Sequence, residues 1–100
     1  MADSPTAGLS AASAAAFEKL RLRFAAGLQQ RWADISEASN AEQQITALHQ
    51  LAGAAGSYGW EPLGAAARRA ELALQQAQPE ALATALQELR ALIEAAMTET

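Results

Sequence analysis

Hydrophobic residues recur at steps of three and four along most of the chain, the spacing that places them on one face of an α-helix. The pattern predicts four helices, from Ser10 or Ser13 to about Ala38, from Asn40 to about Ser57, from Pro62 to about Ala77 and from Pro79 to about Met97. The predicted core faces comprise Phe17, Leu20, Phe24, Leu28, Trp32 and Ile35, then Ile45, Leu48, Leu51, Ala52, Ala55 and Tyr58, then Leu63, Ala66, Ala67, Ala70 and Leu74, and finally Leu82, Leu86, Leu89, Ile93 and Met97.

The predicted helix boundaries coincide with residues that favour helix ends. Asn40 suits the N-cap of the second helix, and Gln43 three places later completes a capping-box pattern. Gly59 can adopt the positive φ that ends a helix, and Pro62 and Pro79 suit the first turns of the last two helices. The connections are therefore short.

Short connections join antiparallel neighbours, so we predict an all-α fold, an antiparallel up-down-up-down four-helix bundle. The chain has 100 residues, enough for one domain, which we place at residues 11–98 after a flexible leader over residues 1–10. Alanine, leucine, glutamine and glutamate dominate, and β-branched and aromatic residues are scarce, which agrees with helices alone.

Charge and composition argue against several classes of function. The formal net charge of −4 leaves no basic face for a nucleic acid, and the absence of cysteine excludes disulfides and thiolate metal sites. One histidine with scattered glutamates does not form a metal site. No apolar run has membrane-spanning length and the N-terminus does not resemble a signal peptide, so we expect a cytoplasmic protein without a membrane partner.

His49, the single histidine, lies on the second predicted helix. At about 100° per residue it points roughly 120° away from the centre of the apolar stripe, towards solvent. Gly53 and Gly56 share its face, although glycine inside a helix costs about 1 kcal/mol relative to alanine. A lone histidine on a helix is ordinarily a plain surface residue, but two missing side chains beside it would let another molecule approach the imidazole.

The segment from Leu48 to Gly59, LHQLAGAAGSYG, resembles the signature of histidine-containing phosphotransfer (HPt) domains of two-component phosphorelays. In that signature a hydrophobic residue lies two places after the histidine, usually a lysine at the third place and a glycine at the fourth. Small residues and a bulky residue followed by glycine complete it. The lysine alone is missing, since Ala52 occupies its place.

The resemblance implies that His49 accepts a phosphoryl group and exchanges it with an aspartate of a response-regulator receiver domain. A sensor histidine kinase would supply the phosphoryl group, and the receiver would hold the Mg²⁺. The chain itself would have no cofactor and no nucleotide site, and would be a carrier and not an enzyme. We expect the receiver to dock on the side of the second helix that carries the glycines, at Glu42, Thr46, Gln50, Gly53, Gly56 and Ser57. The first helix should also contribute to this docking surface.

Two residues of the third predicted helix could assist His49. Glu71 lies at the edge of the buried face, as far after residue 60 as His49 lies before it, and its spacing from His49 resembles that of the orienting glutamate in chemotaxis-type phosphotransfer domains. Such a carboxylate would hold one ring N–H and leave the other nitrogen as nucleophile. Arg68, or else Arg69, could supply the charge of the missing lysine. In the simpler interpretation, all three are exposed residues of a solvated helix face.

Two other functions are compatible with the same residues. The chain could be a non-catalytic helical interaction or dimerisation module with a vestigial histidine, in which Ala52 marks the lost role. It could also be the phosphorylatable segment of a larger kinase or cyclase. Labelling with a phosphodonor separates the carrier from the module.

Overall fold

The computed structural model describes the backbone of residues 4–99 and the side chains of residues 11–99. Within residues 4–99 the chain is all-helical, as predicted, and contains no strand. The helices are α1 (Ser4–Ala26), α2 (Leu28–Ser36), α3 (Ala41–Ser57), α4 (Glu61–Gln75) and α5 (Pro79–Thr98). None of the helices in this described part is long and apolar enough to cross a membrane.

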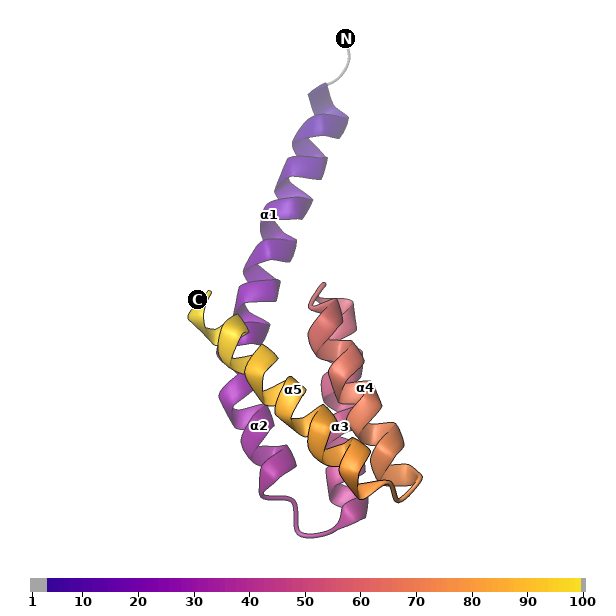
Figure 1. Ribbon diagram of the computed structural model, residues 1–100. Coiled ribbons are helices and arrows are strands. Elements are labelled where there is room, and N and C mark those ends of the chain that lie inside the picture. Colours follow the sequence, from indigo (N-terminus) through magenta and orange to yellow (C-terminus); the bar gives the residue numbers. More distant parts are fainter. Residues whose placement is uncertain (1–3, 100) are drawn as a thin grey trace.

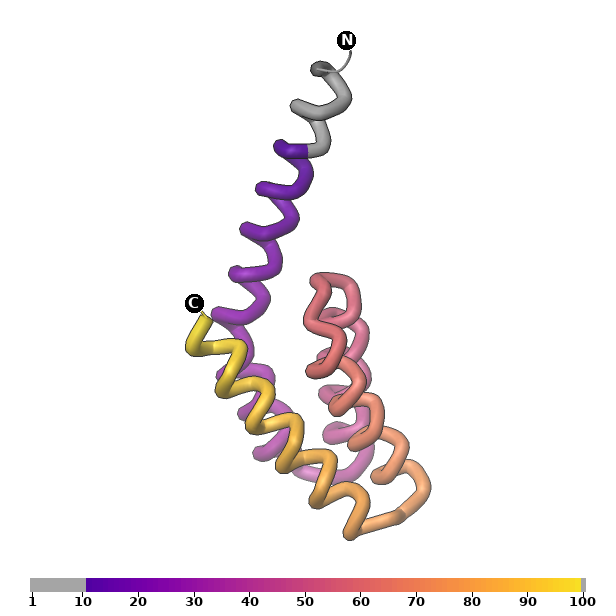
Figure 2. The backbone as a smooth tube through the Cα atoms, turned by 45° about the horizontal axis from the view of Figure 1, so that its top comes forward, coloured from indigo at the N-terminus to yellow at the C-terminus, as the bar shows by residue number. Residues whose placement is uncertain are grey.

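The chain reverses direction at each connection from α2 onwards (Figure 1). Helix α3 packs on α4, α4 packs on α5, and α2 contacts both α3 and α5. The part of α1 drawn in colour in Figure 2 extends beyond the other helices, and its last turns lie beside the end of α5. The core is therefore enclosed by α2 to α5 and the C-terminal turns of α1.

The first predicted helix is interrupted at Gly27. Helix α1 begins at Ser4, earlier than the predicted Ser10 or Ser13, and α2 ends at Ser36, short of the predicted Ala38. Residues 1–3 of the predicted leader lie outside the described residues. The early start is compatible with a proline as the second helical residue, where its missing N–H costs nothing. The break uses the low helix propensity of glycine, whose N–H donates to the Phe24 carbonyl oxygen at 3.0 Å.

The predicted core face of this first segment is correct only in its second half. Phe24, Leu28 and Ile35 are buried, whereas Phe17 and Leu20 are each 43% exposed. The prediction that these two residues are core is wrong because α1 extends past its neighbours. Every side chain from residue 11 to residue 20 is exposed, since no other helix covers that stretch.

The turn between α3 and α4 is anchored to α1. Gly59 has φ of +80°, the left-handed conformation expected for it. Trp60 is 7% exposed, its indole Nε1 donates to the Arg21 carbonyl oxygen at 3.2 Å, and the Arg21 guanidinium lies 3.8 Å from the ring centroid. The ring of Tyr58 packs on Phe24 with centroids 5.6 Å apart. These contacts hold the C-terminal end of α3 in place.

The other helix ends follow the sequence closely. The Asn40 side chain accepts a hydrogen bond from the Gln43 backbone N–H at 2.8 Å, so the predicted N-cap is confirmed. Helix α4 ends at Gln75, before the predicted Ala77, because Ala77 adopts a left-handed conformation with φ of +55°. The N–H groups of Ala77 and Gln78 then bond back to carbonyls of the last helical turn, as in a Schellman motif.

Candidate functional site

His49 projects from α3 into solvent. Leu48, Leu51, Ala52 and Ala55 are buried on the opposite side of the helix, as the apolar pattern predicts. The His49 side chain is 75% exposed. An incoming group can therefore reach the imidazole without any rearrangement of the core.

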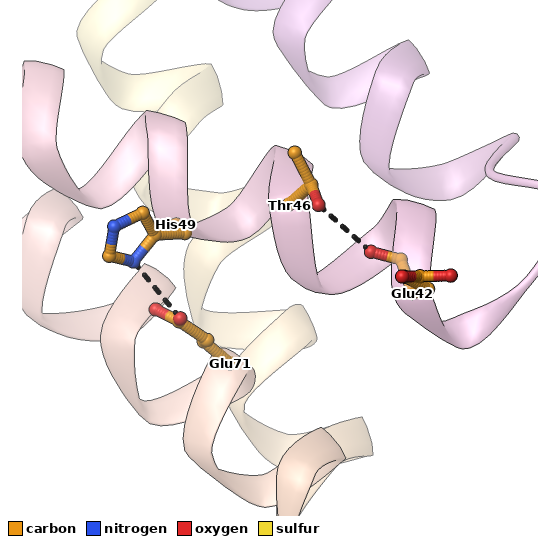
Figure 3. A network of polar contacts seen from close by, with 4 residues as sticks. All are labelled: Glu42, Thr46, His49 and Glu71. Carbon is orange, nitrogen blue, oxygen red and sulfur yellow. Dashed lines mark hydrogen bonds and ion pairs between the residues drawn. The ribbon is translucent and has the colours of Figure 1, made fainter.

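The Glu71 carboxylate lies against the imidazole, and Figure 3 shows it extending from α4 towards the ring. The His49 Nδ1 and Glu71 Oε2 atoms are 3.0 Å apart. An ionised carboxylate can only accept hydrogen bonds, so the proton of this contact lies on Nδ1. In the neutral imidazole, Nε2 is then the unprotonated nitrogen, and it carries the free lone pair. Glu71 is 15% exposed, which restricts its carboxylate to few positions.

The pair forms because α3 and α4 run in opposite directions from the Gly59 turn and pack closely. Alanine makes up half of the buried residues of α3 and most of those of α4, which also include one glycine. Small side chains allow the two backbones to approach, so a glutamate at the edge of the interface can span the remaining distance. The sequence placed Glu71 at this edge, and the structure brings it to His49.

Gly53 and Gly56 are exposed on the same face of α3 as His49. A Cβ atom added at either position would meet nothing within 4 Å outside its own helix. Neither glycine is therefore required for packing inside this protein. The space beside the imidazole is open, as expected for a surface that another molecule approaches.

Replacing Gly53 or Gly56 with alanine is expected to raise the free energy of unfolding by about 1 kcal/mol, because alanine favours the helix and encounters no clash. For a domain of this size the midpoint of thermal unfolding should rise by roughly 4–8 °C. Circular dichroism of single variants measures it. A decrease would mean that these glycines have a structural role that their open surroundings do not reveal.

The predicted docking residues lie in two surface hollows on either side of His49. Gly53, Gly56 and Ser57 line a hollow of about 590 Å³ together with residues of α4. Glu42, Thr46 and Gln50 line another of about 630 Å³. Asp34 of α2 and Glu37, the residue after its end, also line this second hollow. Both lie in the first predicted helix, which was expected to contribute to docking. All six predicted docking residues are exposed.

The Thr46 hydroxyl on this surface already donates a hydrogen bond within the protein. The Thr46 Oγ1 donates to the Glu42 backbone carbonyl oxygen at 3.1 Å, one turn earlier in α3 (Figure 3). This bond orients the Thr46 side chain along its own helix. A partner would therefore meet its methyl group and the acceptor side of its oxygen.

The two arginines of α4 face different neighbours. Arg69 Nη2 pairs with Glu88 Oε1 on α5 at 3.0 Å. Arg68 lines the hollow that contains Gly53 and Gly56, and it forms no ion pair within the described part of the chain. Of the two arginines, Arg68 is thus the one beside the face that carries His49.

Ala52 occupies the place of the lysine in the resembling signature, and its side chain is 2% exposed. Its backbone carbonyl oxygen faces α4, 3.2 Å from the position of a Cβ atom built on Gly64. A lysine here would have to extend its aliphatic stem out of the interface to bring its charge to the side of His49. Among residues 4–99 no group of three or more histidine, aspartate and glutamate side chains could hold a metal ion.

Comparison with known protein families places the chain in one of them. The family model of the Hpt domain matches residues 18–99, which cover the last part of α1 and all of α2 to α5. No curated protein and no solved structure is significantly similar to the chain. Hpt domains are phosphocarrier modules of two-component signalling. Because the match spans most of its length and contains the exposed histidine with its carboxylate partner, the chain belongs to the Hpt domain family.

Proposed function

We propose that this chain is a histidine phosphotransfer protein that exchanges a phosphoryl group between His49 and the aspartate of a response-regulator receiver domain. The observation that carries the proposal is the contact of 3.0 Å between His49 Nδ1 and Glu71 Oε2, which leaves Nε2 open to solvent. In this proposal α1 and α2 together act as one arm of a four-helix bundle, and α3, α4 and α5 are the other three.

The transfer requires one bond exchange at phosphorus. The Nε2 lone pair of His49 attacks the phosphorus of the receiver's aspartyl phosphate in line with the leaving carboxylate oxygen. The N–P bond forms as the P–O bond to aspartate breaks, and the aspartate carboxylate is released. The proton stays on Nδ1, where the Glu71 carboxylate stabilises the positive charge that develops on the ring. The reverse reaction phosphorylates the receiver.

The partner supplies what the chain lacks. The two hollows beside His49 form the proposed docking surface for the receiver, with Gly53 and Gly56 leaving room for its approach. The receiver would hold the Mg²⁺ that neutralises the phosphoryl oxygens, as the family resemblance implies. A sensor histidine kinase, or a receiver phosphorylated by one, would provide the phosphoryl group. The chain then acts as a carrier without a nucleotide site.

Incubation with a phosphorylated receiver domain, or with a labelled small phosphodonor such as phosphoramidate, tests the proposal. The expected product carries one phosphoryl group per chain, on a bond that is stable in base and labile in acid, as an N–P bond is. Absence of label with every donor would favour the non-catalytic interaction module.

Arg68 is the proposed substitute for the missing lysine. Arg68→Gln is expected to slow phosphoryl transfer to His49 by about tenfold, because one charge-assisted contact to the phosphoryl group is lost. Arg69→Gln is the matched control, since it removes the same charge from the α5 side of the same helix. Stopped-flow or quenched-flow transfer rates measure the difference. Equal effects of the two substitutions would remove Arg68 from the mechanism.

A further inference from the structure

We infer that Gly64 is a positioning residue for His49, which sets the distance between α3 and α4 and thereby keeps the imidazole in the tautomer that can accept a phosphoryl group. This inference rests on the proposed function. Gly64 is buried in the first half of α4. A Cβ atom added there would lie 3.2 Å from the Ala52 carbonyl oxygen and 3.4 Å from both the Ala55 Cβ and the Gly56 backbone nitrogen.

These distances show that the backbone of α4 lies directly against that of α3. A Cβ atom at 3.2 Å is tighter than nine in ten observed Cβ contacts, so α3 and α4 would have to separate by a few tenths of an ångström. The obstructing atoms belong mainly to the backbone of α3, which cannot rotate aside as a flexible side chain could. Glycine at 64 is therefore a requirement of the helix spacing.

The same interface carries the His49 and Glu71 pair. Residues 64 and 71 are two helical turns apart on one face of α4, and residues 49 and 52 are one turn apart on α3. A wider spacing at Gly64 would therefore separate Nδ1 from Oε2, which are now at the 3.0 Å of an ordinary hydrogen bond. Without that bond the imidazole is free to place its proton on Nε2, and the nucleophilic nitrogen is lost.

The effect on spacing can be separated from an effect on stability. Alanine is a better helix former than glycine, which offsets part of the strain that its Cβ introduces. Gly64→Ala is therefore expected to fold. Gly53→Ala adds the same methyl group to α3 where nothing lies within 4 Å, and it is the matched control for the tautomer ratio alone, because Gly53 lies on the proposed docking surface.

The experiment measures the ¹⁵N chemical shifts of the imidazole in the full chain labelled with ¹⁵N-histidine, where a single histidine gives an unambiguous signal. We expect the Nδ1–H tautomer to dominate in the wild type and in Gly53→Ala. In Gly64→Ala the ratio of Nδ1–H to Nε2–H should fall on the order of fivefold, the factor that corresponds to one ordinary hydrogen bond. The rate of phosphorylation by phosphoramidate should fall by a similar factor.

A folded Gly64→Ala variant with the wild-type tautomer ratio would overturn the inference. A Gly64→Ala variant that fails to fold would also overturn it, since the glycine would then serve stability and not position. The tautomer ratio is measured without a phosphodonor. If His49 failed to accept a phosphoryl group, the proposed function would be contradicted. The effect of Gly64→Ala on the tautomer ratio could still be assessed.

Discussion

His49→Gln is expected to reduce phosphoryl labelling of the chain to background. Glutamine keeps a polar side chain of similar reach, but its amide nitrogen has no available lone pair for attack on phosphorus. The side chain at this position is 75% exposed, so the free energy of unfolding should change by less than about 0.5 kcal/mol. Labelling with a phosphorylated receiver and with phosphoramidate, followed by electrophoresis, measures the loss.

A histidine moved by one place provides the control. The double variant His49→Gln, Gln50→His keeps the composition of the helix, but its imidazole points about 100° away from the position that contacts Glu71. It should also remain unlabelled by a receiver. Persistent label in His49→Gln would place the phosphoryl group on another side chain. Its stability in acid would then identify an oxygen ester and contradict the assignment of His49.

Glu71→Gln is expected to slow phosphorylation of His49 by roughly 10- to 100-fold, the range typical of losing the partner that orients a histidine. The amide has nearly the same shape as the carboxylate, so the packing of α4 is preserved. It can either accept from Nδ1–H or donate to an unprotonated Nδ1, and therefore no longer selects one tautomer. It also carries no negative charge to stabilise the phosphorylated ring.

Rates of phosphorylation and the ¹⁵N shifts of the imidazole measure the two effects of Glu71→Gln independently. Glu88→Gln is the matched control, because it removes a carboxylate that pairs with Arg69 on the α5 side of the molecule. That variant should phosphorylate at the wild-type rate. If Glu71→Gln is equally fast, Glu71 has no part in the transfer and its contact with His49 is a surface ion pair.

Several features of the site could be predicted because they depend on one helix at a time. The direction of the His49 side chain follows from its angle to the buried stripe of α3. The unoccupied space beside Gly53 and Gly56 follows from their lack of a side chain. The start of α3 at the Asn40 cap and its end at the Gly59 turn follow from local backbone preferences. Each of these is set within a few residues, so the sequence contains all that is needed.

Other features depend on whether a neighbouring helix lies beside a given turn of the helix. The stripe of α1 reads the same at Leu20 as at Phe24, yet only Phe24 is buried, because the helices that cover it do not reach Leu20. The boundary between the covered and the projecting part of α1 lies before the break at Gly27, because Phe24 and Ala25 are already buried while the earlier turns extend beyond the other helices (Figure 1). Periodicity predicts the direction in which a side chain points and contains no information about what lies there.

By itself, the sequence determined the all-helical fold, the exposed histidine and the residues that could serve it. The tertiary structure decided which of them do lie beside it. Glu71 contacts the imidazole and Arg68 lines the adjacent hollow, whereas Arg69 pairs with α5. The physical reason is that these outcomes depend on the distance and rotation between neighbouring helices, α3 and α4 for Glu71 and α4 and α5 for Arg69, which follow from the small buried side chains packed across each interface. Such packing involves residues far apart in the chain, so the hydrophobic pattern of one helix cannot predict it.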